Sequence, residues 1–492
     1  MRRLSRRRFL VASAALGAVS FAPPARAASH GATTKITIGT RTIEVKKKAA
    51  KVFGLMQPDG THGLIMNAGE RFRVRLKNDA GEAALIHWHG LTPPNDQDGV
   101  SGVTQPALEP GQSYEYDFTV ALPGTNWMHS HHVLQEQSLM AAPLIVRDPK
   151  DAARDEQEVV ILLHDFTFEM PDRILSALSK GMSHDHGAMA PAAQDPHAGH
   201  DMSNMDMSGM DMPHDMSQMN MAGMDLNDVS YDAFLANDRT LDDPEVVRVD
   251  KGQRVRLRVI NAASATNFMI DLGPLSGSLT DVDGRPIVPV MGNRFPLAIA
   301  QRADVRFTLP VEEGAWPVLF QREGDTALTG VVLATKSGTI AKIADQAHQA
   351  IGAIDRAASM LYEAAEPLPE RRTDRELKID LTGSMMTYRW GIAEKAAIAH
   401  HAHLMVQEGE RVEMMLTNRT EMSHPMHLHG HHFQVVAVNG SRVKGAVRDT
   451  ELVPIGGSVT LAFDAFNPGK WMFHCHNLYH MLSGMMTQVR YL

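Results

Sequence analysis

The only cysteine of this 492-residue chain lies between two histidines, in the segment HCHNLYHMLSGMM (474–486). His480 follows Cys475 after five residues, and Met485 follows it after ten. A thiolate, two imidazoles and a weak axial thioether are the ligands of a mononuclear copper electron-transfer site. His424, in the segment HPMHLHG, can supply the second imidazole. A lone cysteine is more often a small buried apolar side chain, but that interpretation leaves the flanking histidines unexplained.

Four of the His-x-His pairs along the chain lie at or just past predicted strands. They are His87 and His89, His129 and His131, His427 and His429, and His474 and His476. Alternate residues of a strand point to the same face, so each pair directs two imidazoles to one side. One such pair would be weak evidence, but four of them, one around the only cysteine, predict a cluster of several metal ions.

The N-terminus has the pattern of an export signal. Residues 5–10, SRRRFL, form a twin-arginine motif, and the apolar run 9–22 follows. The sequence Ala25-Arg26-Ala27 offers a cleavage site, so we expect residues 1–27 to be a removed signal and the product to be periplasmic. The apolar run is too short to span a bilayer, and we expect no membrane insertion of the mature form.

The charge and the cysteine count exclude some functions. The formal net charge is −9 and becomes more negative without the arginine-rich signal, which argues against a nucleic-acid partner and suits metal cations. Exported proteins often contain disulfides, but one cysteine cannot pair within the chain. Its thiolate is therefore free to bind a metal ion.

Alternating strand patterns such as RFRVRLKN (71–78) dominate the chain and predict an all-β fold. The length suits about three domains. We place them at residues 35–150, 156–340 and 376–492, with a linker at 341–375. Within 340–366, Ile343, Ala347, Ile354 and Leu361 recur at helical spacing and predict an amphipathic helix.

Residues 182–224 interrupt the second domain with a tract rich in methionine, histidine, aspartate, serine and glycine. Such a composition buries too little apolar surface to fold alone, so we predict a flexible insert. A spacer that tolerates methionine is one interpretation. Because thioethers favour Cu(I) and imidazoles suit Cu(II), we favour metal capture.

With HWHG, HSH, HPxHLHG and HCHxxxHxxxxM in this order, the sequence resembles the multicopper oxidases over nearly its whole length. The methionine tract and residues 231–268 resemble the periplasmic copper-resistance, laccase-like branch. The resemblance implies three cupredoxin-like β-sandwich domains and four copper ions. It implies a type 1 copper on His424, Cys475, His480 and Met485; a type 2 copper on His87 and His427; and a type 3 pair on His89, His129 and His476 and on His131, His429 and His474.

The resemblance also implies an acid that delivers protons to O₂. Asp98 is one candidate, although an aspartate before glycine is equally typical of a turn, and Glu136 is a second. Some relatives carry an acid directly after the second type 1 histidine, where this chain has Met481. Cys475 is expected to conduct electrons between the two sites. We expect the His480 ring edge to lie nearest the solvent, where the reductant docks.

The leading hypothesis is therefore an oxidase that couples one-electron oxidation of Cu(I) to reduction of O₂ to water in periplasmic copper tolerance. Laccase-like oxidation of phenols is a second hypothesis. A third is copper sequestration without catalysis, which leaves the arrangement around Cys475 unexplained.

Overall fold

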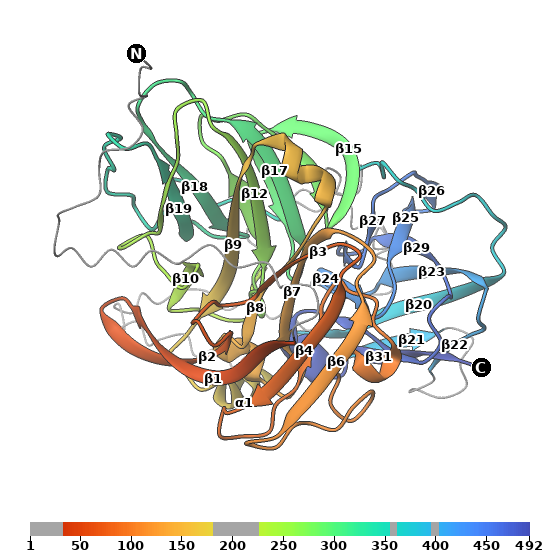
Figure 1. The fold of residues 1–492 in the computed structure, drawn as a ribbon. Helices are drawn as coiled ribbons and strands as arrows, with labels where there is room; N and C mark the ends of the chain where they lie inside the picture. The colour runs from red at the N-terminus through yellow and green to blue at the C-terminus, as the bar shows by residue number, and fades with distance from the viewer. Residues whose placement is uncertain (1–32, 181–225, 355–361, 395–402) are drawn as a thin grey trace, which may run out of the picture.

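The computed structural model describes residues 33–180, 226–354, 362–394 and 403–492. The predicted export signal and the methionine tract lie outside these residues. Six β-sheets pair into three cupredoxin-like sandwiches, which confirms the all-β prediction. In Figure 1 the second sandwich lies above the first, and the third lies to their right.

The first sandwich packs two four-stranded sheets against each other. One sheet has the order β2 (Lys48–Met56), β1 (Thr34–Val45), β4 (Arg71–Asn78), β6 (Ser113–Thr119), and the other β3 (Leu64–Asn67), β8 (Ala141–Arg147), β7 (Gly124–Ser130), β5 (Ile86–His87). The alternation in β4 is confirmed: Phe72, Val74 and Leu76 are buried in the core, while the intervening arginines are exposed.

The second sandwich is larger. Its first sheet has the order β10 (Ala233–Ala236), β9 (Gln157–Phe166), β12 (Arg254–Asn261), β17 (Arg302–Thr308), β14 (Gly277–Val282), β15 (Arg285–Gly292). Its second has the order β11 (Val246–Arg248), β19 (Leu328–Ala334), β18 (Ala315–Arg322), β13 (Phe268–Asp271), β16 (Arg294–Leu297). Helix α1 (Pro171–Ser179) follows β9 and was not predicted; it begins at a proline and buries Ile174 and Leu178, one turn apart.

The third sandwich carries the cysteine segment. Its first sheet has the order β21 (Arg389–Glu394), β20 (Arg375–Ser384), β23 (Arg411–Asn418), β29 (Ser458–Asp464), β25 (Phe433–Val438), β26 (Ser441–Arg442), and β27 (Val447–Arg448) pairs with β25. Its second has the order β22 (Leu404–Val406), β31 (Met486–Tyr491), β30 (Lys470–Cys475), β24 (His424–Leu428), β28 (Thr450–Val453). Helix α3 (Leu478–Leu482) connects β30 to β31.

The helix predicted over 340–366 is wrong in the part of that segment that the structure describes, which contains no helix; residues 355–361 lie outside it. The backbone instead bonds to loops of the second sandwich, where Ala347 N donates to Thr326 O at 2.7 Å. Ile354 is buried between the second and third sandwiches. Tertiary hydrogen bonds thus replaced the local ones that the apolar spacing suggested.

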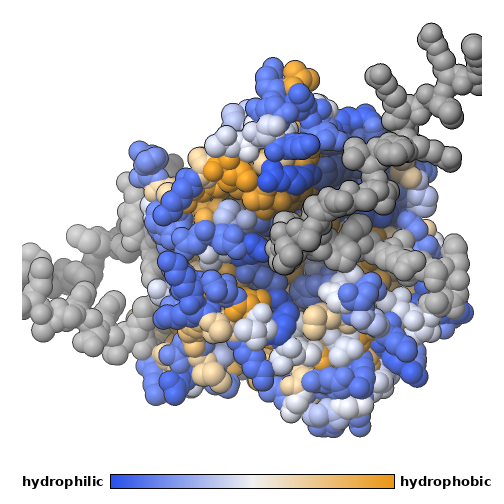
Figure 2. All heavy atoms as spheres, turned by 60° about the vertical axis from the view of Figure 1, so that its left-hand side comes forward, coloured by the Kyte–Doolittle hydropathy of each residue, from blue (hydrophilic) through white to orange (hydrophobic). Residues whose placement is uncertain are grey.

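The surface in Figure 2 is mostly hydrophilic, with apolar patches scattered between polar ones. Such a surface agrees with the negative formal charge of the chain. Among the residues that the structure describes, no helix has the length and apolar character needed to cross a membrane.

Candidate metal centre

A buried triad of His424, Cys475 and His480 lies inside the third sandwich. The two Nδ1 atoms are 3.1 Å apart, and Cys475 Sγ lies 3.7 Å from the Nδ1 of His424 and 3.8 Å from that of His480. Bonds of about 2.0 Å to nitrogen and about 2.3 Å to sulfur, at 120° to each other, would separate nitrogen from sulfur by about 3.7 Å. The triad therefore has the size of a trigonal metal site.

Local structure sets this geometry. Strands β24 and β30 pair with Met426 opposite Cys475, which brings His424 near the sulfur. Helix α3 then returns His480 to the same place. Asn477 caps that helix, because its side-chain oxygen accepts from the backbone N–H groups of Tyr479 at 3.1 Å and of His480 at 3.3 Å.

The outer nitrogens of the triad are occupied. His424 Nε2 bonds to Thr420 Oγ1 at 2.7 Å, and His480 Nε2 lies 2.8 Å from Asp228 Oδ2. These partners leave both Nδ1 lone pairs facing the sulfur. Two lone pairs 3.1 Å apart repel each other unless a cation or a proton lies between them.

The expectation that the His480 ring edge lies nearest solvent is wrong, because this side chain is 0% exposed. The Trp390 ring packs over it with centroids 4.2 Å apart. Asp228 covers its outer nitrogen and also accepts from Tyr388 Oη at 2.8 Å and Asn477 Nδ2 at 2.9 Å. A reductant therefore meets the side chains around His480 before it meets the imidazole.

Burial raises the pKa of the Cys475 thiol and lowers the pKa of His424 well below its usual range. Without a metal the thiol therefore keeps its proton and the imidazole stays neutral. A bound cation has to displace the thiol proton, so occupancy depends on pH. Met485 is also fully buried, and its carbonyl accepts from Cys475 N at 3.0 Å.

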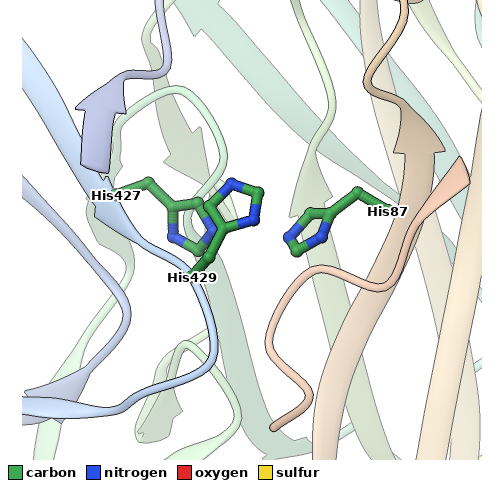
Figure 3. Close-up of side chains that lie close together, drawn as sticks. All are labelled: His87, His427 and His429. Carbon is green, nitrogen blue, oxygen red and sulfur yellow. The ribbon is translucent and has the colours of Figure 1, made fainter. Parts of the chain in front are cut away.

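The eight paired histidines meet where the first and third sandwiches adjoin. The register of β5 and β7 sets His87 opposite His129, and that of β24 and β30 sets His427 opposite His474. Figure 3 shows His87 approaching from the first sandwich toward His427 and His429 of the third. The His87 and His429 rings stack with centroids 3.8 Å apart.

The histidine nitrogens fall into compact groups. His474 Nε2 lies 3.1 Å from His429 Nε2 and 3.5 Å from His131 Nε2. The ring of His476 lies 5.0 Å from that of His129 and 5.1 Å from that of His89, between centroids. The groups whose candidate ligand atoms all lie within 4.8 Å of one another include His131, His429 and His474; His87, His89 and His129; and His87, His427 and His429.

Most of these rings use one nitrogen for an outward hydrogen bond. The Nδ1 atoms of His87, His129, His427 and His474 donate to the carbonyl oxygens of Asp98 at 2.9 Å, Ser130 at 3.0 Å, Asp449 at 2.8 Å and Cys475 at 2.9 Å. The inner nitrogens have no hydrogen-bond partner within the described ranges: Nε2 of His87, His129, His427 and His476, and Nδ1 of His89. Buried lone pairs without a donor are costly unless an ion meets them.

Burial is also the main electrostatic effect in this cluster. It lowers the pKa of the rings, and neighbouring rings lower it further, as for His89, His129, His131, His427, His429 and His476, and to about 4 for His474. Neutral imidazoles are the form that binds metal ions. Imidazole nitrogens from eight rings and one thiolate, a soft ligand, form a donor set that suits copper.

Both acids predicted from the sequence touch this cluster. Asp98 is 0% exposed, and its Oδ2 lies 2.8 Å from His429 Nδ1. Asp98 also lies in a turn, since Gly99 has φ +82° and a side chain there would collide with the backbone of β5. Glu136 Oε2 lies 2.9 Å from His129 Nδ1, and burial raises the Glu136 pKa well above its usual range.

A cavity of about 200 Å³ reaches the cluster from the boundary of the two sandwiches. Its lining includes His131, His474, His476, Glu136 and the thioether of Met481. This volume can hold a small molecule such as O₂ or several waters.

Sequence reasoning missed three residues. Asp228 covers His480, while Asp449 contacts His89 Nε2 at 3.0 Å and is itself held by Arg302. Asp449 follows Arg448 in a segment that also contains Arg442, Lys444 and Glu451, so its sequence context gave no sign of a buried aspartate. Asp228 and Arg302 belong to no recognisable motif.

Three segments of the chain match the family described as multicopper oxidase: residues 40–151, 197–340 and 370–492. The chain is 30% identical to the multicopper oxidase MmcO of Mycobacterium tuberculosis over 86% of this chain and 80% of that protein. It is 25% identical to copper resistance protein A of Escherichia coli, over 96% and 94%.

Solved structures agree in fold. Fet3p, a multicopper oxidase that functions in iron import, superposes with a TM-score of 0.70 at 17% identity, over 93% of this chain and 90% of that one. The laccase-like multi-copper oxidase CueO of Ochrobactrum sp. gives 0.68 at 19%, over 96% and 99%. The chain thus belongs to the multicopper oxidases, copper-containing enzymes that pass electrons from a reducing substrate to O₂.

Proposed function

We propose that this oxidase uses Cu(I) as its reducing substrate and acts in periplasmic copper tolerance. The ligand assignment is part of the proposal. His424, Cys475, His480 and Met485 would hold a type 1 copper; His87 and His427 a type 2 copper; and His89, His129 and His476, with His131, His429 and His474, a type 3 pair. Bound copper would supply one-electron transfer at the first site and reduction of O₂ at the others.

The backbone around Cys475 joins the two sites. Its direct sequence neighbours His474 and His476 belong to the cluster, so one peptide bond joins Cys475 to each of these histidines. The hydrogen bond from His474 Nδ1 to Cys475 O, 2.9 Å long, adds a second short connection. This linkage supports the assigned role of Cys475 as the electron conductor.

Asp98 and Glu136 are the proposed proton-delivering acids. Asp98 contacts a ring of the third sandwich, whereas Glu136 contacts His129 and lies on the wall of the cavity. Burial raises the pKa of Glu136 well above its usual range, which favours the protonated carboxyl that a proton donor needs. Met481 cannot deliver a proton, so these two acids replace the one that some relatives carry at that place.

The electrostatics beside His480 favour a cation as the reductant. Burial opposes ionisation of Asp228, but the His480 imidazole and the hydrogen bonds around the carboxylate prevail and hold its pKa below the usual range. An anionic side chain at the outer nitrogen of His480 attracts Cu(I) more strongly than a neutral phenol. This contact is the observation that carries the choice of substrate.

The methionine tract, residues 182–224, supports the same choice. Helix α1, which precedes it, buries Ile174 and Leu178 in the apolar cluster that contains Tyr479 and Met481. Val229, which follows the tract, belongs to that cluster too. The described segments on both sides of the tract are therefore anchored on the apolar core of the third sandwich, which also contains Cys475. Soft thioether ligands tethered there would raise the local concentration of Cu(I).

The cellular location rests on the twin-arginine pattern of residues 5–10 and on the similarity to copper resistance protein A. A periplasmic oxidase that converts Cu(I) to Cu(II) would lower the concentration of Cu(I) in that compartment. This function would benefit from the negative charge of the chain.

Removing residues 182–224 tests the substrate. Aerobic consumption of Cu(I) at low concentration is expected to fall, while turnover of a phenol stays unchanged. A full-length protein with every methionine of the tract replaced by glutamine is the matched control, because it keeps the tract length and should lose the same efficiency. Unchanged Cu(I) efficiency in both variants would contradict the assigned role, and a phenol turnover that exceeds Cu(I) turnover would favour the laccase-like alternative.

A further inference from the structure

The side chain of Arg302, on β17 of the second sandwich, reaches all three sandwiches. Its Nε donates to Thr125 O of the first at 3.0 Å, and its Nη1 donates to Ala300 O of the second at 3.1 Å. Its two Nη atoms hold both carboxylate oxygens of Asp449, in the third, at 2.7 and 2.5 Å. Arg302 is 0% exposed. A buried guanidinium is tolerated only when its donors are satisfied, as they are here.

Asp449, which Arg302 holds in place, contacts two histidines of the cluster. Its Oδ1 lies 3.0 Å from His89 Nε2, and its carbonyl oxygen accepts from His427 Nδ1 at 2.8 Å. Thr450 Oγ1 donates to the same Oδ1 at 2.9 Å. An imidazole that donates from one nitrogen presents the lone pair of the other. His89 therefore presents Nδ1 and His427 presents Nε2.

The chain next to His89 leaves room for this arginine. Gly90 has φ +91°, and a Cβ atom there would lie 2.7 Å from Arg302 Nη2 and 2.3 Å from Asn126 Oδ1. A larger residue at position 90 would push the guanidinium away from Asp449. The glycine, the arginine and the aspartate thus form one continuous support behind His89.

We propose that Arg302 is a positioning residue of the oxygen-reducing copper cluster. It holds Asp449 in the position that fixes which nitrogen each ring presents to the cluster, Nδ1 for His89 and Nε2 for His427. The second sandwich, which carries none of the eight paired histidines, thereby sets the geometry of ligands from the other two. The inference rests on the ligand assignment proposed above for His89 and His427.

Arg258 provides a matched control. It also lies in the second sandwich, its side chain is 1% exposed, and it donates to Thr125 Oγ1 at 2.8 Å. Its remaining partners are Glu158 and Asp304, so it links the first and second sandwiches without touching Asp449. Arg258→Gln should therefore weaken the fold as much as Arg302→Gln without disturbing the cluster.

The experiment compares copper content, the blue thiolate absorption and the type 2 electron paramagnetic resonance signal of copper-loaded proteins. Since the proposed type 1 ligands all lie in the third sandwich, the blue absorption reports whether each variant has folded. Arg302→Gln is expected to keep it, to bind type 2 copper about 10- to 100-fold more weakly, and to change the type 2 signal. Arg302→Lys keeps the charge, but one ammonium group cannot reach Thr125 O and both Asp449 oxygens, so an intermediate loss is expected.

Retention of the full copper content and of the wild-type type 2 signal in both Arg302 variants would overturn the inference. Equal copper loss in Arg258→Gln would also overturn it, because the effect would then follow from weaker packing of the sandwiches. If Arg302→Gln does not fold, Arg302→Lys alone decides between these results. Wild-type protein that binds copper only at the blue site would refute the proposed function itself, and this inference with it.

Discussion

Replacing His164 by asparagine tests how much of the loss of folding stability at low pH comes from buried neutral histidines. His164 lies in β9, is 1% exposed, and donates from Nδ1 to Ala262 O at 3.0 Å. Its Nε2 has no partner within the described part of the chain. Burial, opposed in part by the carboxylate of Asp238, lowers its pKa from 6.5 to about 4.

The sign of the effect follows from proton binding. Between pH 6.5 and 4 the unfolded chain holds a proton on this residue that the native protein does not hold, so stability falls as the pH falls through that window. From pH 7 to pH 5 the loss is about 2 kcal/mol for this one residue. That is a large part of a typical unfolding free energy of about 5–15 kcal/mol.

In His164→Asn the amide Nδ2 can take the place of the imidazole Nδ1 and donate to Ala262 O. The smaller side chain costs a fixed amount at every pH, so the difference in unfolding free energy from wild type should narrow by about 2 kcal/mol between pH 7 and pH 5. Urea unfolding at several pH values measures this. His348→Asn, the same substitution at an exposed position, is the control. A difference that stays constant with pH for His164→Asn would refute the reasoning.

Three further predictions concern the copper centres. Asp228→Asn should lower kcat/KM for Cu(I) by about 10-fold or more while sparing a neutral phenol, because the variant loses only the charge beside His480; steady-state kinetics with both substrates would reveal an equal loss if the carboxylate is merely structural. Glu136→Gln should lower kcat by about 10- to 100-fold with little change in KM, and an unchanged kcat would leave Asp98 as the only proton donor among the two candidates. Lowering the pH from 7 to 5 should weaken copper loading, since the metal has to displace the proton of the Cys475 thiol, whose pKa burial raises; copper titrations that give one affinity at both pH values would contradict this.

The histidine cluster could be predicted in part, because one member of each pair lies in a strand and the other follows shortly after the strand ends. The alternation of side chains along β24 and β30 directs His427 and His474 to the same face, and their antiparallel register sets them opposite each other. Which pairs converge depends on how the sandwiches pack. The resemblance to a known family, and not the spacing, supplied that part of the prediction.

The contacts of Asp449 and Arg302 behind the histidine cluster could not be predicted, because they join distant parts of the chain. The contact between His89 and Asp449 spans 360 residues, and Arg302 lies 147 residues from Asp449. The helix predicted over 340–366 failed for a related reason. Apolar spacing describes the local preference of the chain, whereas hydrogen bonds from a neighbouring sandwich decided the conformation of the described part.

The exposure of His480 was also misjudged. Its ring edge was expected to lie nearest the solvent, yet Asp228 and Trp390 approach it from other segments and cover the ring. Burial of a side chain is a property of the whole fold, and one sequence contains no direct record of it.

The central claim is that Cys475 joins a single-copper site to a three-copper site. The most direct test is the copper content of wild-type protein and of Cys475→Ser, measured together with the thiolate absorption band. Wild type should bind four copper ions per chain with an intense blue band, and the variant should lose one ion, the band and the oxidase activity. Oxidase activity or a blue band that survives in Cys475→Ser would contradict the account.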